Sequence, residues 1–399
     1  MNITRKIAWL LIAAFIISLW PGESPAIPVF ARKYGFNCTM CHSNFPRLND
    51  FGWRYRQNGY QIPGRENEDK TVLESPPPFA ARVSAGYNND SYIRTPGAID
   101  TRRFEVNGLD LLSGGLIGRN IGYFLIYPPQ INASRGVQGQ DGTVEMANVI
   151  FSNLASTWLN VRAGRFEPAY AAVSVKRNLA FSPCEIYDVG APNGMVFSET
   201  QEGIEVTGYG YGLSYAAGYV NGSPTNDPDD GPTDYYVRMA AVLGQGEGQT
   251  AGQRIGVTGY WGSARPDPAL MPRDSRQPFS RVAVDASLNF MQINLTAQYL
   301  TGQDNRRLWG AAKPVSFEGG FAELSVLPAT NFVGLVRYDW VNAPVKQDRD
   351  ITRWTGAIRY YPQDNLALHF EYSQRKQQNM VRRQEAVENF YTVRMDFVF

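Results

Sequence analysis

The chain has 399 residues, and its 38 Lys and Arg residues nearly balance its 37 Asp and Glu residues. A formal net charge of +1 gives no reason to expect nucleic acid or another polyanion as a partner. Beyond the first twenty residues no apolar stretch is long enough for a membrane-spanning helix. These properties exclude a helical membrane protein and leave a large soluble β protein or a membrane β-barrel.

The N-terminus predicts an export signal. Two basic residues precede an apolar run over residues 7–20, and the small residues Ser24 and Ala26 suit cleavage by signal peptidase. The run is short for a membrane-spanning helix, although an uncleaved anchor is the alternative. We therefore expect residues 1–26 to be a signal peptide and the mature chain to begin at Ile27.

Cys38, Cys41 and His42 form a C-x-x-C-H motif, which is the attachment pattern of a c-type haem. At this spacing two thiols reach the vinyl groups on one edge of the porphyrin, and the adjacent imidazole turns underneath to bind the iron. The chain holds three cysteines and two histidines, so the chance expectation for the motif is on the order of 10⁻⁴. We predict one covalent haem c, with thioether links at Cys38 and Cys41 and His42 as the proximal iron ligand.

Other interpretations of the motif fit less well. A structural zinc site needs four ligands, and the remaining candidates, Cys184 and His369, are isolated in the sequence. A thioredoxin-like motif would lie beside a βαβ pattern, which is not found around residues 38–41. A simple disulfide between these two cysteines would leave the histidine unexplained.

Residues 27–70 are too few to wrap a haem, so part of the haem pocket must come from elsewhere in the chain. Phe51 and Tyr55 lie four residues apart on a helix expected after Pro46. With Phe45 they are candidate haem contacts, and an ordinary small apolar core is the alternative.

From about residue 79 onward, apolar and polar residues alternate in segments as long as a tilted transmembrane β-strand requires. In residues 291–299 every odd position is apolar and every even position is an uncharged polar residue. A strand with one face toward lipid and the other toward a water-filled lumen would have this pattern. About sixteen such segments can be counted, at residues 78–88, 101–112, 119–127, 143–153, 156–166, 201–208, 211–220, 234–243, 253–262, 279–289, 291–301, 315–326, 330–340, 351–361, 364–374 and 390–399.

Short and long connections alternate between these segments. Residues 113–115 and 362–364 are tight, whereas residues 128–142 and 375–389 are long and polar. A transmembrane barrel has short periplasmic turns and long outer loops, whereas a soluble β-sandwich has no reason to alternate. The Gly-rich connection 244–252 fits the pattern least well.

The longest connection, residues 167–200, joins the fifth and sixth predicted strands. The chain resembles porins there, whose corresponding loop folds inward and narrows the pore. Phe399, on the lipid-facing side of the last strand, is similar to the terminal aromatic residue of bacterial outer-membrane proteins. We predict an all-β fold, an antiparallel outer-membrane barrel of about sixteen strands over residues 71–399, with residues 27–70 as a small helical haem segment that plugs it from the periplasmic side.

The lumen faces of the predicted strands carry the remaining candidate residues. His369 is the second histidine and a candidate distal ligand of the haem iron, with a plain lumen-lining role as the alternative. A methionine is another candidate for the distal ligand, and the methionines considered are Met146, Met195 and Met380. The acidic loop 227–231 could attract ferrous ion, although Asp-rich turns are commonly only solvated. Charged residues predicted to face the lumen and to pair with one another are Arg82, Arg103, Arg162, Arg238, Arg281, Arg337, Arg359, Arg394, Glu105, Asp285, Asp339, Glu371 and Asp396.

The exported segment resembles the fused monohaem cytochrome-porins of iron-oxidising bacteria. The pattern F-A-R-x-x-G-x-x-C-x-x-C-H-x-x-(F/Y)-P-x-L is carried here by Phe30, Ala31, Arg32, Gly35, Cys38, Cys41, His42, Phe45, Pro46 and Leu48. The resemblance implies an outer-membrane barrel plugged by its haem segment. It also implies electron transfer from an extracellular donor, Fe(II) in the best-known branch, to a periplasmic cytochrome or other redox protein. Outward electron flow and a solute porin with a haem-containing plug or sensor are the alternatives.

Overall fold

The computed structural model describes residues 29–36, 40–44, 46–66, 68–74, 79–94, 97–129, 142–222, 233–244, 252–265, 276–329, 331–343, 349–363, 365–379 and 384–398. The predicted signal peptide, Cys38, Phe45, the acidic loop 227–231, Met380 and Phe399 lie outside these residues.

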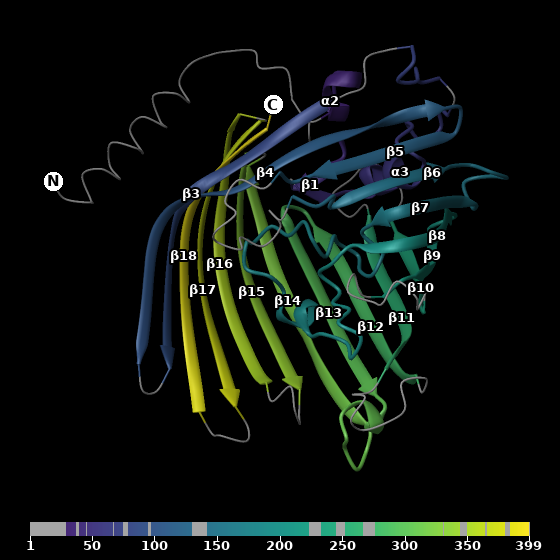
Figure 1. Ribbon diagram of the computed structural model, residues 1–399. Helices are drawn as coiled ribbons and strands as arrows, with labels where there is room; N and C mark the ends of the chain where they lie inside the picture. The colour runs from purple at the N-terminus through teal and green to yellow at the C-terminus, as the bar shows by residue number, and fades with distance from the viewer. Residues whose placement is uncertain are drawn as a thin grey trace.

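Sixteen antiparallel strands, β3 to β18, form a closed barrel (Figure 1). Each strand pairs with its neighbours in the sequence, and β18 pairs with β3 to close the barrel. The predicted number and order of strands are therefore confirmed. The strands are β3 (Phe79–Arg94), β4 (Ala98–Gly118), β5 (Ile121–Tyr127), β6 (Met146–Phe151), β7 (Asn160–Phe166), β8 (Gln201–Gly210), β9 (Leu213–Val220), β10 (Asp234–Leu243), β11 (Gln253–Ala264), β12 (Gln277–Phe290), β13 (Ile293–Asp304), β14 (Val315–Ala329), β15 (Phe332–Ala343), β16 (Arg349–Gln363), β17 (Leu366–Asn379) and β18 (Gln384–Val398).

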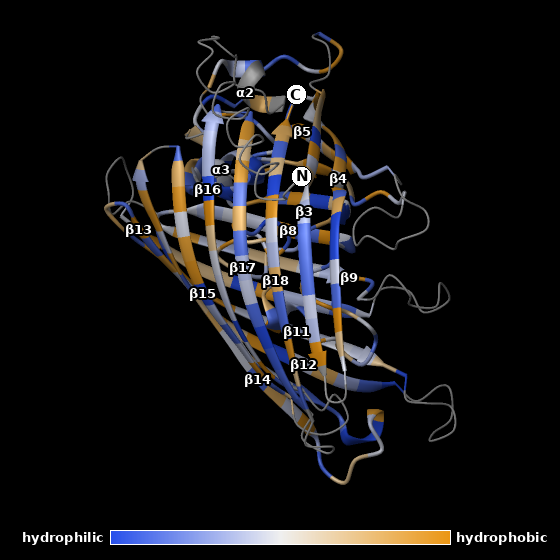
Figure 2. Ribbon diagram, turned by 90° about the vertical axis from the view of Figure 1, so that its left-hand side faces the viewer, coloured by the Kyte–Doolittle hydropathy of each residue, from blue (hydrophilic) through white to orange (hydrophobic). Residues whose placement is uncertain are grey.

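The alternation in the sequence separates an apolar outer face from a polar inner face (Figure 2). In β13, Leu295 and Tyr299 are 42% and 43% exposed on the outside, whereas Thr296 and Gln298 are 1% and 2% exposed on the inside. Such a band of outward apolar side chains suits contact with lipid hydrocarbon. No helix among the described residues has the length and hydropathy needed to cross a bilayer.

Several strands extend further than the hydropathy pattern predicts. The connection expected at residues 375–389 is mostly strand, since β17 continues to Asn379 and β18 begins at Gln384. These residues lack the alternation of the apolar band, yet the backbone ladder continues through them, as in the pair Gln378 and Glu385. Backbone hydrogen bonds extend the sheet beyond its apolar band, so that loop prediction was wrong.

Two-residue turns join β4 to β5, β8 to β9 and β12 to β13, all at one end of the barrel, which we call the short-turn end. The described residues between 29 and 74, which we call the plug, lie at this end (Figure 1). The Gln61 side chain donates to Ser152 at 3.1 Å, and the Val72 amide donates to the Leu116 carbonyl at 2.8 Å. The plug contains α2 (Val29–Tyr34), a hairpin of β1 (His42–Asn44) and β2 (Arg47–Leu48), and α3 (Asp50–Gln57).

Residues 167–200, which we call the inward loop, run inside the barrel (Figure 1). The loop includes the short 3-10 helix η2 (Glu185–Asp188), which packs against β14 and β15. Tyr170, Ile186 and Met195 are each 1% exposed, within a cluster that also contains wall residues such as Tyr260. The predicted inward course of this loop is confirmed, and its side chains occupy the middle of the lumen. A second short 3-10 helix, η4 (Arg306–Leu308), lies in the connection between β13 and β14.

Candidate haem-binding site

The hairpin that carries Cys41 and His42 is held against α3. Asn49 caps α3, because its side chain accepts the Gly52 amide at 2.9 Å, and its own backbone amide donates to the Cys41 carbonyl at 2.9 Å. A Cβ at Gly52 would lie 2.2 Å from the same Cys41 carbonyl oxygen. The helix predicted after Pro46 is therefore present, and its close approach fixes the second half of the C-x-x-C-H motif.

The imidazole of His42 is oriented by the turn of the hairpin. Its Nδ1 lies 3.1 Å from the Pro46 carbonyl oxygen, which fixes the tautomer with the proton on Nδ1 because a carbonyl can only accept. In this tautomer Nε2 carries the lone pair that binds metals. Desolvation at this half-buried position lowers the pKa of His42 to about 4, so the ring is neutral at physiological pH.

Cys41 and His42 both line a large cavity between the plug and the barrel wall. The cavity has an empty volume of about 1410 Å³, including its open mouth. The other lining residues are Phe30, Tyr34, Phe36, Pro46, Leu48, Phe51, Gly52, Tyr55, Arg56 and Tyr60 of the plug, Ala80, Arg82, Leu112, Phe124, Ile126, Met146 and Val398 of the wall, and Glu167, Ser174 and Arg177 of the inward loop.

Aromatic rings form much of this cavity. Phe30 stacks on Tyr60 with ring centroids 5.0 Å apart, and Tyr60 stacks in turn on the wall residue Phe124 at 5.3 Å. Phe51 and Tyr55 stack at 6.4 Å on the side of α3. The sequence predicted that the plug could supply only part of an apolar pocket. The barrel wall supplies the rest through residues that no motif marked, of which Phe124 is the clearest.

Three guanidinium groups also line the cavity, from Arg56, Arg82 and Arg177. Arg82 pairs with Asp110 at 2.6 Å, and its Nε is buried with no hydrogen-bond partner among the described residues. A haem carries two propionate groups, and guanidinium is the side chain best suited to bind carboxylates. The apolar walls, the neutral imidazole and these cations together match the chemistry of a haem c.

The plug is fastened to the wall by buried polar contacts. Arg47, 7% exposed, donates to Asn294 at 2.7 Å and pairs with Glu323 at 2.5 Å. Arg254 of β11 pairs with Asp50 of α3 at 3.0 Å. A buried ion pair stabilises only while both partners are present, so these contacts tie the position of the plug to the barrel.

A pair of glycines allows the plug and the wall to approach closely. Gly59 follows α3 with a φ of +66°, the left-handed conformation that commonly ends a helix. A Cβ at Gly122 of β5 would lie only 2.2 Å from the Gly59 carbonyl oxygen. The two backbones therefore meet here with no room for a side chain on the wall.

His369 lies in the lumen, as its alternation predicted, but it is not among the residues that line the cavity. It is 0% exposed, and both of its ring nitrogens are engaged. Arg359 donates to Nδ1 at 2.7 Å, and Nε2 lies 3.1 Å from a Glu371 carboxylate oxygen. Phe181 of the inward loop covers the ring, with centroids 4.2 Å apart. The structure does not bring the two histidines together.

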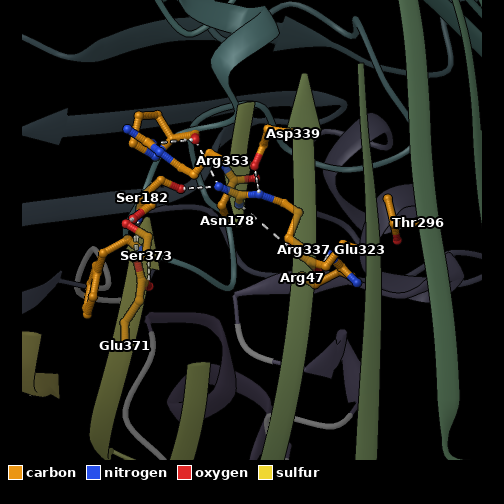
Figure 3. Close-up of polar contacts among 12 residues, drawn as sticks. Arg47, Asn178, Ser182, Thr296, Glu323, Arg337, Asp339, Arg353, Glu371 and Ser373 are labelled. Carbon is orange, nitrogen blue, oxygen red and sulfur yellow. Dashed lines mark hydrogen bonds and ion pairs between the residues drawn. The ribbon is translucent and has the colours of Figure 1, made fainter. Parts of the chain in front are cut away.

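The predicted lumen charges face inward and form pairs. Arg337 is 2.8 Å from Asp339 and donates to the inward loop at the Ser182 carbonyl at 2.7 Å, and Ser182 hydrogen-bonds Glu371 in turn (Figure 3). Further ion pairs join Arg82 to Asp110, Arg103 to Glu105, Arg162 to Glu205, Arg238 to Asp285 and Arg281 to Asp304. The guanidinium group of Arg394 packs over the Phe181 ring, and Asp396 is buried. Among them, Arg162, Arg238, Arg337 and Glu371 hydrogen-bond the inward loop directly and hold it in place.

The remaining candidates are spread over the molecule. Met146 lines the cavity, whereas Met195 belongs to the cluster around the inward loop. Cys184 is 2% exposed in the inward loop, and burial raises the pKa of its thiol. Among the described residues, no group of three or more His, Cys, Asp or Glu side chains is arranged to hold a metal ion directly.

Comparison with models of known protein families gives no match, and comparison with curated protein sequences gives none either. Solved structures of porins are similar in fold. An anion-selective porin from Comamonas acidovorans superposes with a TM-score of 0.57 at 11% identity, covering 80% of this chain and 99% of that one. The outer-membrane channel DcaP of Acinetobacter baumannii superposes with a TM-score of 0.55 at 12% identity, covering 80% of this chain and 97% of that one. OmpF of Salmonella typhi superposes with a TM-score of 0.55 at 10% identity, again covering 80% of this chain and 97% of that one. The chain therefore has a porin-like barrel fold.

Proposed function

We propose that this protein is an outer-membrane electron carrier, which passes electrons from an extracellular donor, Fe(II), to a periplasmic redox protein through one covalent haem c. The observation that carries this proposal is the cavity that Cys41 and His42 share with the barrel wall. A bound haem c supplies an iron that accepts and releases one electron at a time. Each Fe(II) would lose one electron and each ferric cytochrome acceptor would gain one, with no atom transferred.

The residues of the chain have distinct tasks in this proposal. Cys38 and Cys41 would anchor the porphyrin, and His42 would bind its iron through Nε2. The aromatic residues exclude water, which tunes the potential at which electrons are exchanged. Arg56, Arg82 and Arg177 hold the propionates as charge-assisted partners.

The barrel supports one orientation for this proposal. Outer-membrane barrels have short turns on the periplasmic side, so the short-turn end with its plug would face the periplasm. The haem site would then be within reach of a soluble periplasmic partner. The extracellular donor would deliver its electron from the side of the long loops.

A solute porin whose plug carries haem as a structural or sensing group is the second candidate, and the fold similarity to channels favours it. The filled lumen argues against it. The inward loop occupies the middle of the barrel with side chains that are almost fully buried, and the plug covers the short-turn end.

One experiment separates the two. The purified protein is reconstituted into liposomes that contain ferric cytochrome c, and Fe(II) is added outside under anaerobic conditions. Electron transfer predicts Fe(II)-dependent reduction of the trapped cytochrome, with protein-free liposomes and the His42→Ala variant as controls. Rapid swelling in small sugars without cytochrome reduction would instead identify a solute porin. If dithionite reduces the haem of the purified protein but Fe(II) does not, iron is not the donor.

A further inference from the structure

Four neighbouring strands present one row of side chains to the haem cavity. Ala80 of β3 pairs with Leu112 of β4, Leu112 pairs with Ile126 of β5, and Ile126 pairs with Met146 of β6. All four residues line the cavity. Ala80, Leu112 and Ile126 have hydrocarbon side chains, which can only exclude water. Met146 differs because a thioether sulfur has lone pairs that bind haem iron.

Met146 and His42 come from different walls of the cavity. His42 is carried by the plug hairpin, whereas Met146 is the first residue of β6 in the barrel wall and is 3% exposed. Haem iron takes its two axial ligands from opposite faces of the porphyrin. A ligand pair drawn from the plug and from the wall suits a haem held between them.

Among the described residues, the other side chains that could coordinate the iron are excluded by their positions. Met40, Met239, Met291 and Met395 are 41%, 61%, 54% and 46% exposed, and none of them lines the cavity. Met195 packs in the inward-loop cluster, and His369 uses both ring nitrogens in hydrogen bonds. The cavity also contains tyrosines, but tyrosine binds iron as a phenolate, which apolar surroundings disfavour.

We infer that Met146 is the distal ligand of the haem iron. This inference rests on the proposed function, since it needs a haem bound at Cys41 and His42. Coordination by Met146 would link the plug to the barrel wall through the iron. It would also raise the reduction potential relative to a second histidine, because a thioether favours the ferrous state.

The test compares purified Met146→Leu with Met195→Leu. Leucine conserves volume and apolar character, so both variants are expected to fold, and heat-modifiable migration on a gel checks the barrel. We expect Met146→Leu to lose the long-wavelength sulfur-to-iron absorption band, become high-spin, bind carbon monoxide when reduced and shift to lower potential. Met195→Leu should retain the parental spectrum and potential.

A third variant, Met146→His, covers the case in which leucine disturbs the barrel. Histidine at this position should restore a low-spin spectrum without the sulfur band, at a potential below the parent. Unchanged spin state and potential in a folded Met146→Leu protein would overturn the inference. Covalent haem is measured in the same samples by staining denaturing gels. A parent protein without haem contradicts the proposed function itself, whereas haem that is indifferent to Met146 contradicts only the ligand.

Discussion

The two histidines of the chain have different surroundings. His42 borders a cavity with aromatic walls and an open mouth, and one of its nitrogens is fixed by a backbone carbonyl. His369 lies in the packed middle of the barrel, where Arg359, Glu371 and Phe181 surround it. Packing therefore distinguishes the two imidazoles, since only that of His42 borders open space.

The strongest way to test this contrast is to remove each histidine. His42→Ala should lose covalent haem almost completely, because the iron loses its proximal ligand during assembly. His369→Ala should keep the haem and an unchanged Soret band, but its barrel should be about 3–5 kcal/mol less stable, since Arg359 and Glu371 lose a buried partner. Haem staining, absorbance and urea titration measure these effects. A shifted Soret band in His369→Ala would mean that this residue reaches the iron after all.

The second prediction concerns the attachment of the plug. Arg47→Ala should weaken plug docking by about 3 kcal/mol, because Glu323 is left charged and buried. Chymotrypsin should then cut at the aromatic residues of α3 about a hundredfold faster, because cleavage follows the population of the opened form. The double variant Arg47→Met with Glu323→Gln is the control and should recover most of the protection. Equal cleavage of Arg47→Ala and the parent would show that this pair does not hold the plug.

A third, smaller effect is expected where the two backbones meet. Gly122→Ala should cost about 1–3 kcal/mol of plug docking, because its methyl group would overlap the Gly59 carbonyl. Gly356→Ala is the matched control, since nothing lies within 4 Å of a Cβ at that position. The same protease assay compares them. Similar protection of the two variants would indicate that the plug is not seated on β5.

The smallest effect is expected at Cys184. The chain has three cysteines, and two thioether links would leave Cys184 as the one thiol. Because burial raises the pKa of this thiol, it should not react with maleimide in the native protein. After denaturation one label per chain is expected, and Cys184→Ala should give none while keeping its haem. Three labels in the denatured parent would mean that no haem is attached.

The barrel could be predicted from the sequence because one physical rule governs every strand. Residues such as Leu295 and Thr296 alternate since one face meets lipid and the other the lumen. Strand ends were less predictable, as at Asn379, because beyond the apolar band only backbone hydrogen bonds determine where pairing stops.

The candidate site was predictable only in part. Cys41 and His42 were proposed because their spacing is typical of haem attachment, and Phe51 and Tyr55 because they share a helix face; all four line the cavity. The sequence offered Met146 only as one of three methionines, since its place in the cavity depends on which wall the plug covers. The engagement of His369 was hidden, because the inward loop that covers it is about 190 residues away in the chain. Contacts between distant segments leave no local pattern in the sequence.

The central claim is that a haem is covalently held at the cavity between the plug and the barrel wall. The most direct measurement is the intact mass of the purified, denatured chain together with its pyridine haemochrome spectrum. We predict the mass of the mature chain plus one haem, a c-type spectrum, and loss of both in a variant with Cys38→Ala and Cys41→Ala. A chain of unmodified mass, or haem that dissociates on denaturation, would contradict the claim.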